Sequence, residues 1–499
     1  MFSELVPGFL LFFNLLNLSF ISLGVFLGII FGSIPGLNAI IGVALVLPFT
    51  FYMEPDTAIC LLLGIYKGGV YAGSIPAILL NIPGAPEAAA TAQDGYNLTK
   101  AGKGGKALRA SIYASLIGNV FSDILLIVVA AQLAKLALKV GPPEMFALLL
   151  FALTIIGAVS GANFSKGLIA GIAGLFAASI GMDVVTGVSR FTFGIFELSG
   201  GIPFLPMLMG MFAISEIFIQ TEQKIGEGIQ IHKVSSETKA DSKLKWEEFA
   251  PCLPSIFRSC AVGALIGAIP GPGATTSAFV SYALTRQFSK NPEKIGTGSI
   301  EGVASPDAAN NATCSASLIP VLTLGIPGSP IAAVIAGALL IHGINPGPMI
   351  FENNATLIYS FYFGMLFASF LVFIFGFIAI RTAIKAVQIS RSILFPIVFI
   401  LCFIGTYANN SRGLDLIIMT LFGIVGYLMR KSGFSVPAFV IAFLLGPTME
   451  SAFKQSLLIG DGELSIFIHR PIAVAFLVLA ILSAYFLKRQ RDRLKTLGF

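Results

Sequence analysis

Long uncharged apolar runs recur along the whole chain and constrain its fold more than any other feature. These runs are Phe9–Phe31, Ile124–Ala134, Ala147–Ala162, Gly167–Gly181, Ala355–Ile380, Ser392–Tyr407 and Pro471–Leu487. Only 11% of the 499 residues are charged, whereas soluble domains carry about 25%. About 20 apolar residues are enough to cross a bilayer as a helix. The sequence therefore predicts an all-α polytopic membrane protein with about a dozen transmembrane helices and some shorter, broken pieces.

Residue patterns of several other protein classes are missing from this sequence. The three histidines, His232, His342 and His469, are isolated, and the five cysteines are scattered without metal-ligand spacing. We expect the cysteines to be small packing residues inside helices. Without a GxxxxGK[ST] or an HExxH motif, the chain is not expected to be an enzyme, to use ATP or to carry a metal or cofactor. The net charge of +6 indicates the loop bias of a membrane protein, not a nucleic-acid partner.

Helix breakers stand inside the apolar sequence, and they occur twice in the same order. The stretch "SIPAILLNIPGAPEAAA" begins at Ser74 and "LIPVLTLGIPGSPIAAV" begins at Leu318, an offset of 318 − 74 = 244 positions. Upstream of each lies a related pair, "GSIPGLNA" at Gly32 and "GAIPGPGA" at Gly267, with an offset of 267 − 32 = 235. We interpret this as an internal duplication. It predicts a first transmembrane repeat at 1–219, a polar linker at 220–249, and a second repeat with C-terminal helices and a basic tail at 250–499.

Loop charges predict that the two repeats are inverted relative to each other. After the second motif the first half has "LTKAGKGGKALR", and after the first motif the second half has "TRQFSKNPEK". The other two loops, "FYMEPDT" and "HGINPGPMIFENN", contain no Lys or Arg. Because Lys and Arg prefer the cytoplasmic side, equivalent loops are expected to face opposite sides of the membrane. The same rule predicts a cytoplasmic linker and C-terminus, although Lys135 and Lys139 then fall outside.

The proline and glycine pairs predict interrupted helices that form a binding site. A proline removes a backbone hydrogen bond, and freed backbone groups are tolerated at membrane depth only inside protein or along a wet cavity. Inverted-repeat transporters build their binding sites from such interruptions. Thr275 and Thr276 follow "PGPG", and Asn38 stands at the corresponding place in the first half. This pattern indicates an anion cradle made twice; the alternative is that each Pro-Gly pair only kinks a helix for packing.

A polar group in "SPDAANNATCSAS" is a candidate for the coupling ion. Asp307, Asn310 and Asn311 stand at the mouth of a hydrophobic segment. Their side chains suit ligation of Na⁺ or a proton relay. The alternative is that they cap the next helix.

Three further charges fall within or beside apolar sequence. Lys67 either neutralises a substrate carboxylate or extends its ammonium to the membrane interface. Asp123 is expected to be an acid at a helix start in preference to a proton site. Asp94–Gly95 is expected to form a turn before the basic loop.

At these motifs the chain resembles the large membrane subunit of tripartite tricarboxylate transporters. The matching stretches are "IPGLNAIIGVALVLPFTF", "YAGSIPAILLNIPGAPEAAATAQDGY", "IPGPGATTSAFVSYAL", "EGVASPDAANNA" and "LIPVLTLGIPGSPIAAVIAGALLIHGINPGP". The resemblance implies a carrier in the bacterial cytoplasmic (inner) membrane that imports a small carboxylate, driven by a Na⁺ or H⁺ gradient. It also implies two protein partners, a periplasmic solute-binding protein and a small membrane subunit.

The resemblance also implies which residues bind the substrate. The family's binding segments fall on the four interruptions and give as candidates Pro35, Gly36, Leu37, Asn38, Asn81, Pro83, Gly84, Pro270, Gly271, Pro272, Gly273, Thr275, Thr276, Gly325, Pro327, Gly328 and Ser329. Lys67 is a further candidate because of its own position inside an apolar run, and not because of the resemblance. Two other functions stay open from the sequence. One is a standalone carboxylate carrier that needs no binding protein, and the other is an anion channel, since glycine-lined pores also conduct.

Overall fold

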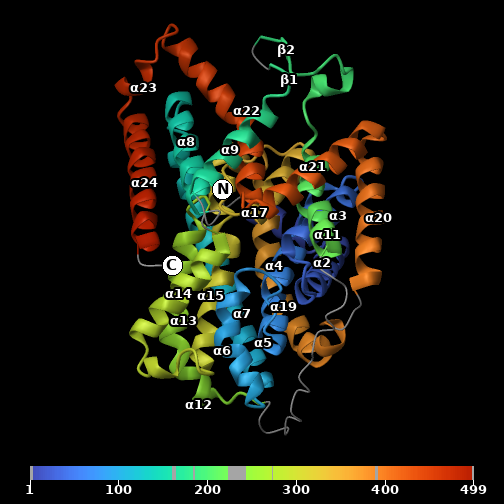
Figure 1. Cartoon of the computed structure of the whole chain (residues 1–499), viewed down its shortest axis with the longest axis vertical. Coiled ribbons are helices and arrows are strands. Elements are labelled where there is room, and N and C mark those ends of the chain that lie inside the picture. Colours follow the sequence, from blue (N-terminus) through green and yellow to red (C-terminus); the bar gives the residue numbers. More distant parts are fainter. Residues whose placement is uncertain are drawn as a thin grey trace.

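A computed structural model describes residues 4–159, 164–183, 186–222, 243–271, 273–387 and 391–496 (Figure 1). Helices make up 80% of it. Within these ranges the strands are the two-residue β1 (Gly181–Met182) and β2 (Ser189–Arg190), which pair antiparallel. Eight helices of the described ranges are long and apolar enough to cross a membrane, and six shorter apolar helices of 10–17 residues accompany them. The structure therefore confirms the prediction of an all-α polytopic membrane protein.

The helices that carry and flank the motifs of the first half run from α1 to the long helix α7. They are α1 (Leu5–Phe12), α2 (Leu15–Ser33), α3 (Ala39–Thr50), α4 (Pro55–Ala72), α5 (Ser74–Leu80), α6 (Ala88–Lys100) and α7 (Gly104–Ala137). α2 lies directly on the backbone of α4. A Cβ at Gly28 would overlap the carbonyl oxygen of Ile65, and a Cβ at Gly32 would overlap that of Gly69. Glycines four residues apart let two membrane helices approach this closely.

The second half repeats this packing. Its elements are α13 (Leu253–Gly267), α14 (Gly273–Phe288), η5 (Pro292–Lys294), α15 (Ile300–Ala316), α16 (Ile319–Leu324), α17 (Pro330–Ile341), α18 (Ile350–Asn353) and α19 (Ala355–Val387). A Cβ at Gly263 on α13 would overlap the carbonyl oxygen of Ala309 on α15. Gly263 follows Gly28 by 263 − 28 = 235 positions, and Ala309 follows Ile65 by 309 − 65 = 244. The offsets between the sequence motifs therefore also hold for this helix contact.

The remaining elements lie between and after these two sets of helices. They are α8 (Pro142–Val159), α9 (Phe164–Ala178), η2 (Phe196–Gly200), α10 (Phe204–Met209), the π-helical turn η3 (Gly210–Ile214), α11 (Ser215–Glu222), α12 (Trp246–Phe249), η4 (Ala250–Cys252), α20 (Arg391–Asn410), α21 (Gly413–Lys431), α22 (Val436–Ile459), α23 (Ile466–His469) and α24 (Pro471–Thr496). α9 packs on α22, and α8 packs on α24 at the edge of the molecule (Figure 1). The β1–β2 hairpin stands at one end of the molecule and α12 at the other.

Most of the predicted polar linker, 220–249, falls on residues 223–242, which lie outside the described ranges. The repeat boundaries at 219 and 250 stay predictions. The expectation for the cysteines is confirmed, because Cys60, Cys252, Cys260, Cys314 and Cys402 are all buried and free.

The helices that follow the motifs meet in pairs across the two halves. Asn97, near the end of α6, donates a hydrogen bond from Nδ2 to the carbonyl oxygen of Gly296, 3.0 Å away in the loop after α14. His342, directly after α17, has its Nε2 3.3 Å from Oγ1 of Thr50 at the end of α3. α6 lies in the lower part of the molecule, and α3 lies nearer its middle (Figure 1). The two basic loops are therefore neighbours of each other, and so are the two loops without Lys or Arg.

Asp94, in the middle of α6, connects this helix to the loop after α14. Its carboxylate accepts hydrogen bonds at 2.7–2.9 Å from three backbone N–H groups of the loop 296–299. It also accepts one from the hydroxyl of Tyr282 at 2.8 Å. The expected turn at Asp94–Gly95 is wrong, because both residues lie inside α6. A buried carboxylate is stable here because donors of the other half surround it.

Replacing Asp94 by Asn should loosen this connection. An amide in place of the carboxylate removes the charged acceptor, and hydrogen bonds to charged groups contribute about 1.5–3 kcal/mol each. We expect the unfolding temperature of the purified protein to fall clearly. Tyr282→Phe, which removes a single donor, should cost only about 1 kcal/mol. Equal unfolding temperatures for Asp94→Asn and the native protein would contradict a stabilising role.

Candidate functional site

Each half contains two interruptions between helices. The first interruptions lie between α2 and α3 and between α13 and α14, and the second lie between α5 and α6 and between α16 and α17. The second interruption of the first half, residues 81–87, turns back along its own helix. α5 ends at Leu80, and Asn81 has a left-handed backbone with φ 58°. The chain then reverses, so that the N–H of Gly84 donates to the carbonyl oxygen of Gly73 at 3.1 Å. A Cβ at Gly84 would overlap the carbonyl oxygen of Gly32 at the end of α2. Residues 81–87, the first return segment, are therefore held against the first interruption of the same half.

The second half contains the same arrangement. Gly325 after α16 has φ 72°, and the N–H of Gly328 donates to the carbonyl oxygen of Ser317 at 3.3 Å. A Cβ at Gly328 would lie 2.5 Å from the carbonyl oxygen of Gly267. The N–H of Gly271 also donates to the carbonyl oxygen of Gly328 at 3.3 Å. Residues 325–329, the second return segment, thus contact the other interruption of their own half through backbone alone.

The first interruptions of the two halves also share their conformation. Gly36 and Gly271 have φ 94° and 111°, a region that favours glycine. Asn38 caps α3, and Ser329 caps α17, each by accepting a hydrogen bond from a backbone N–H three residues later. Pro272 lies outside the described residues. The other candidates of the predicted cradle lie in or directly after one of the four interruptions, and they are Pro35, Leu37, Pro83, Pro270, Gly273, Thr276 and Pro327.

Polar contacts join the interruptions of the two halves. Thr275 on α14 has its Oγ1 3.5 Å from Oε2 of Glu87, at the end of the first return segment. Tyr66 on α4 has its hydroxyl 3.0 Å from Oγ of Ser317. The hydroxyl of Ser329 in turn lies 3.2 Å from the same Ser317 oxygen. The four interruptions therefore form one connected region, and each half contributes polar groups to the other.

Asp307 on α15 is fully buried and contacts residues on both sides of the first return segment in the sequence. Its Oδ1 accepts hydrogen bonds from Ser74 at 2.7 Å and from Thr91 at 2.5 Å, the residues that open α5 and follow the return segment on α6. Its Oδ2 has no hydrogen-bond partner among the described residues. The capping alternative is wrong for Asp307, because α15 begins at Ile300 and Asp307 stands two turns inside it.

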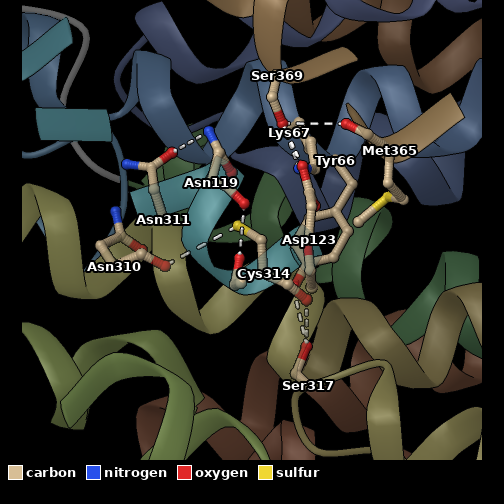
Figure 2. A network of polar contacts seen from close by, with 12 residues as sticks. Tyr66, Lys67, Asn119, Asp123, Asn310, Asn311, Cys314, Ser317, Met365 and Ser369 are labelled. Atoms are coloured by element: carbon tan, nitrogen blue, oxygen red, sulfur yellow. Dashed lines mark hydrogen bonds and ion pairs between the residues drawn. The ribbon is translucent and has the colours of Figure 1, made fainter. Parts of the chain in front are cut away.

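The two asparagines of α15 have different surroundings (Figure 2). Asn311 donates to Oγ of Ser115 at 2.8 Å and accepts from Nδ2 of Asn119 at 3.1 Å, so it ties α15 to α7. Asn310 is also buried, but its side-chain amide makes no hydrogen bond within the described ranges. Buried polar groups nearly always have partners. Asn310, Oδ2 of Asp307 and Oδ1 of Asn119 are therefore open groups of this cluster within the described ranges.

Lys67 forms a buried ion pair with Asp123 (Figure 2). Its Nζ donates to Oδ1 and Oδ2 of Asp123 at 2.6 and 2.8 Å and to Oγ of Ser369 at 2.6 Å. Both charged side chains are 0% exposed. The alternative that Lys67 extends its ammonium to the membrane interface is therefore wrong. For the other alternative, contact with a substrate carboxylate, the three N–H donors of Lys67 leave none over in this structure. Asp123 lies within α7, so the expected helix-start acid is also wrong.

A hollow of about 420 Å³ opens away from the interruptions, between α17, α22 and the β1–β2 hairpin. Its two cations are engaged by carboxylates. Arg190 makes two hydrogen bonds to Glu450, at 2.6 and 3.0 Å, and Lys454 forms an ion pair with Asp183. Because its cations are paired with carboxylates, we expect the hollow to attract an anion less strongly than the interruptions do.

Sequence reasoning missed four polar residues of this region: Tyr66, Ser74, Glu87 and Thr91. A signal existed for two of them. Glu87 is the single acid in the repeated motif "SIPAILLNIPGAPEAAA". Thr91 follows it by four residues and therefore shares its face of α6.

The fold and this region define the class of the protein. It is a polytopic helical membrane protein whose paired, interrupted helices meet inside the fold, a construction that secondary transporters use. The chain belongs to the tripartite tricarboxylate transporter TctA family, whose model matches residues 18–441.

Two similar proteins come from Agrobacterium vitis. An uncharacterized 52.8 kDa protein in the TAR-I ttuC' 3' region is 34% identical over 96% of this chain and 94% of its own length. An uncharacterized protein in the TAR-II ttuC' 3' region is 36% identical over 44% of this chain and 90% of its own length. No solved structure matches the chain.

Proposed function

We propose that this protein is the large membrane subunit of an importer that carries a small carboxylate across the bacterial cytoplasmic membrane. A gradient of Na⁺ or H⁺ drives the import, a periplasmic solute-binding protein delivers the substrate, and a small membrane subunit completes the complex. Membership of the TctA family supports the transporter class. The observation that carries the proposal is the meeting of four interrupted segments at one connected region, with matching hydrogen bonds in both halves.

The proposal includes two repeats of opposite orientation. The end of α6 in the first half lies beside the loop after α14 in the second. The end of α3 lies beside the end of α17. By the sequence offsets, α3 corresponds to α14 and α6 to α17, so each helix end neighbours the non-equivalent helix of the other half. Two copies related by an axis in the membrane plane are arranged in this way.

The starts of four helices give the region its preference for an anion. α3, α6, α14 and α17 each begin at an interruption. The N-terminus of a helix carries about half a positive charge and offers backbone N–H groups that have no partner within the helix. Helix starts bind carboxylates and phosphates for this reason. A carboxylate held by such groups and by the hydroxyls of Thr275 and Thr276 does not need Lys67.

The coupling cation is proposed to bind at Asp307 and Asn310. Oδ2 of Asp307 and the amide of Asn310 are buried without partners in the described part of the chain, and carboxylate and amide oxygens are ligands for hard cations. Asn311 is proposed to support this site by holding α15 against α7. The hydroxyls of Ser74 and Thr91 connect the site to the first return segment. A cation there favours one conformation of that segment, which couples its binding to the substrate site.

Asp307→Asn should weaken the cation dependence of uptake. Loss of the carboxylate removes the charge that attracts the cation, so we expect the half-saturating cation concentration for uptake to rise about 10-fold or more. The measurement is uptake in proteoliposomes at varied external Na⁺ and pH. Thr285→Ala, at another buried hydroxyl, is the matched control and should leave the cation dependence unchanged. A normal cation dependence in Asp307→Asn would assign the coupling ion to other residues.

Transport is proposed to follow alternating access. The interrupted helices move against the flanking helices, so the cradle opens to one side of the membrane at a time.

The experiment that tests this function is reconstitution in proteoliposomes with a panel of small mono-, di- and tricarboxylates. Saturable uptake that follows an imposed Na⁺ or H⁺ gradient supports a secondary carrier, whereas uptake that grows linearly with substrate concentration supports an anion channel. Addition of the cognate periplasmic binding protein separates the remaining alternatives. If uptake is equally fast without it, the protein is a standalone carrier, and the tripartite proposal is wrong.

A further inference from the structure

The Lys67–Asp123 pair has the geometry of an occupied cation site. Three oxygen atoms lie 2.6–2.8 Å from Nζ of Lys67. The carboxylate of Asp123 is also hydrogen-bonded by the hydroxyl of Ser315, and Oγ of Ser369 lies 2.6 Å from its Oδ2. A carboxylate and hydroxyls are oxygen ligands of the kind that hard cations take in proteins. The ammonium thus occupies a pocket of oxygens and satisfies all three of its donors.

Four helices from both halves build this pocket. Lys67 and Asp123 come from α4 and α7 of the first half, and Ser315 and Ser369 come from α15 and α19 of the second. Each of these polar side chains is fully buried. An ionised group at such a place is costly in a membrane protein unless it is paired, and it marks a functional site by default.

In the second copy, the position equivalent to Lys67 is occupied by a residue with a neutral amide. Asn311 follows Lys67 by 311 − 67 = 244 positions, the offset of the repeated motif. Both side chains bind a long helix of the other half, Lys67 through Ser369 on α19 and Asn311 through Asn119 on α7. In the second copy, polar groups without partners in the described ranges lie on the same helix as Asn311. In the first copy the side chain at the position equivalent to Asn311 is the ammonium of Lys67, which bonds to Asp123 and Ser369.

We propose that Asp123, Ser315 and Ser369 form a monovalent-cation site that Lys67 fills with its own ammonium. The native chain therefore keeps a permanent, covalently attached cation between the two halves, and no free ion binds there. Any coupling ion must then bind at another place in the molecule. This inference concerns the ion pair alone and holds whatever substrate the protein carries.

Removal of the ammonium should expose the site to free ions. Lys67→Ala takes away the charge and most of the side-chain volume but leaves the oxygens of Asp123, Ser315 and Ser369. The unfolding temperature of the purified full chain in detergent is measured in NaCl and in choline chloride at equal ionic strength. A ligand that binds only the folded state stabilises it. We expect Na⁺ to raise the unfolding temperature of Lys67→Ala by about 2 °C or more beyond its effect on the native protein.

The control is Lys67→Ala combined with Asp123→Asn, which lacks the carboxylate and should lose the extra response to Na⁺. A response of Lys67→Ala no larger than that of the native protein would overturn the proposal, and so would an equal response in the double variant. If Lys67→Ala folds only when Na⁺ is present, the proposal is supported. If it folds in neither salt while Lys67→Met with Asp123→Leu folds normally, the pair is a structural contact and the proposal is wrong.

Discussion

Alanine in place of Gly328 or Gly84 should reduce carboxylate uptake about 10- to 100-fold while the protein still inserts in the membrane. Each glycine lies on a carbonyl oxygen of its own half, that of Gly267 or of Gly32, with no space for a Cβ. Overpacking of a tight contact costs about 1–3 kcal/mol. Because the contact joins two interruptions, this strain is relieved by displacing the return segment from the proposed cradle. A tenfold change in rate corresponds to about 1.4 kcal/mol.

The measurement is the initial rate of uptake per reconstituted protein in proteoliposomes. Gly413→Ala is a matched control, because a Cβ at Gly413, the first residue of α21, meets no atom within 4 Å. This variant should transport at the native rate. Full activity of both Gly84→Ala and Gly328→Ala would show that the return segments do not need their contacts with the first interruptions for transport.

Asp123→Asn should be among the most destabilising single substitutions in the chain. It preserves the shape of the side chain but leaves the ammonium of Lys67 buried without a counter-charge. Breaking a buried ion pair from one side costs about 3–5 kcal/mol. We expect a large fall in the unfolding temperature and in the amount of folded protein recovered from membranes. Added Na⁺ should not rescue this variant, because a cation repels the ammonium that remains.

The matched comparison is the double substitution Lys67→Met with Asp123→Leu, which replaces both charges by apolar groups of similar size. Such replacements are often neutral or stabilising, so most of the lost stability should return. A double-mutant cycle on the unfolding temperature then measures the coupling between the two positions. If Asp123→Asn is as stable as the native protein, the buried pair contributes little to stability.

The interrupted helices could be predicted from the sequence because their signal is local. Proline and glycine change the backbone at their own positions, and the two copies of the motif agree at Pro83 and Pro327 and at Gly84 and Gly328. The left-handed turn at Asn81 was harder to predict from the sequence, because asparagine tolerates this conformation but does not require it.

The partners of the charged residues could not be predicted, because each partner lies far away in the sequence. In the sequence, Asp123 has the pattern of an ordinary acid beside an apolar run. In the structure, α7 places it against Lys67, which is 56 positions earlier. Asp94 before a glycine has the local signature of a turn. Backbone donors more than 200 positions later keep it in a helix. Tertiary contacts override local preference in both cases.

The glycine contacts of the two halves have a mechanical consequence. In each half, backbone touches backbone where the two interruptions meet, at Gly84 with Gly32 and at Gly328 with Gly267. Close-packed interiors transmit displacement instead of absorbing it. Each pair of interruptions must therefore travel as a rigid block. In the proposed alternating access, each block moves as a unit against the flanking helices, and the two blocks contact each other where Thr275 meets Glu87.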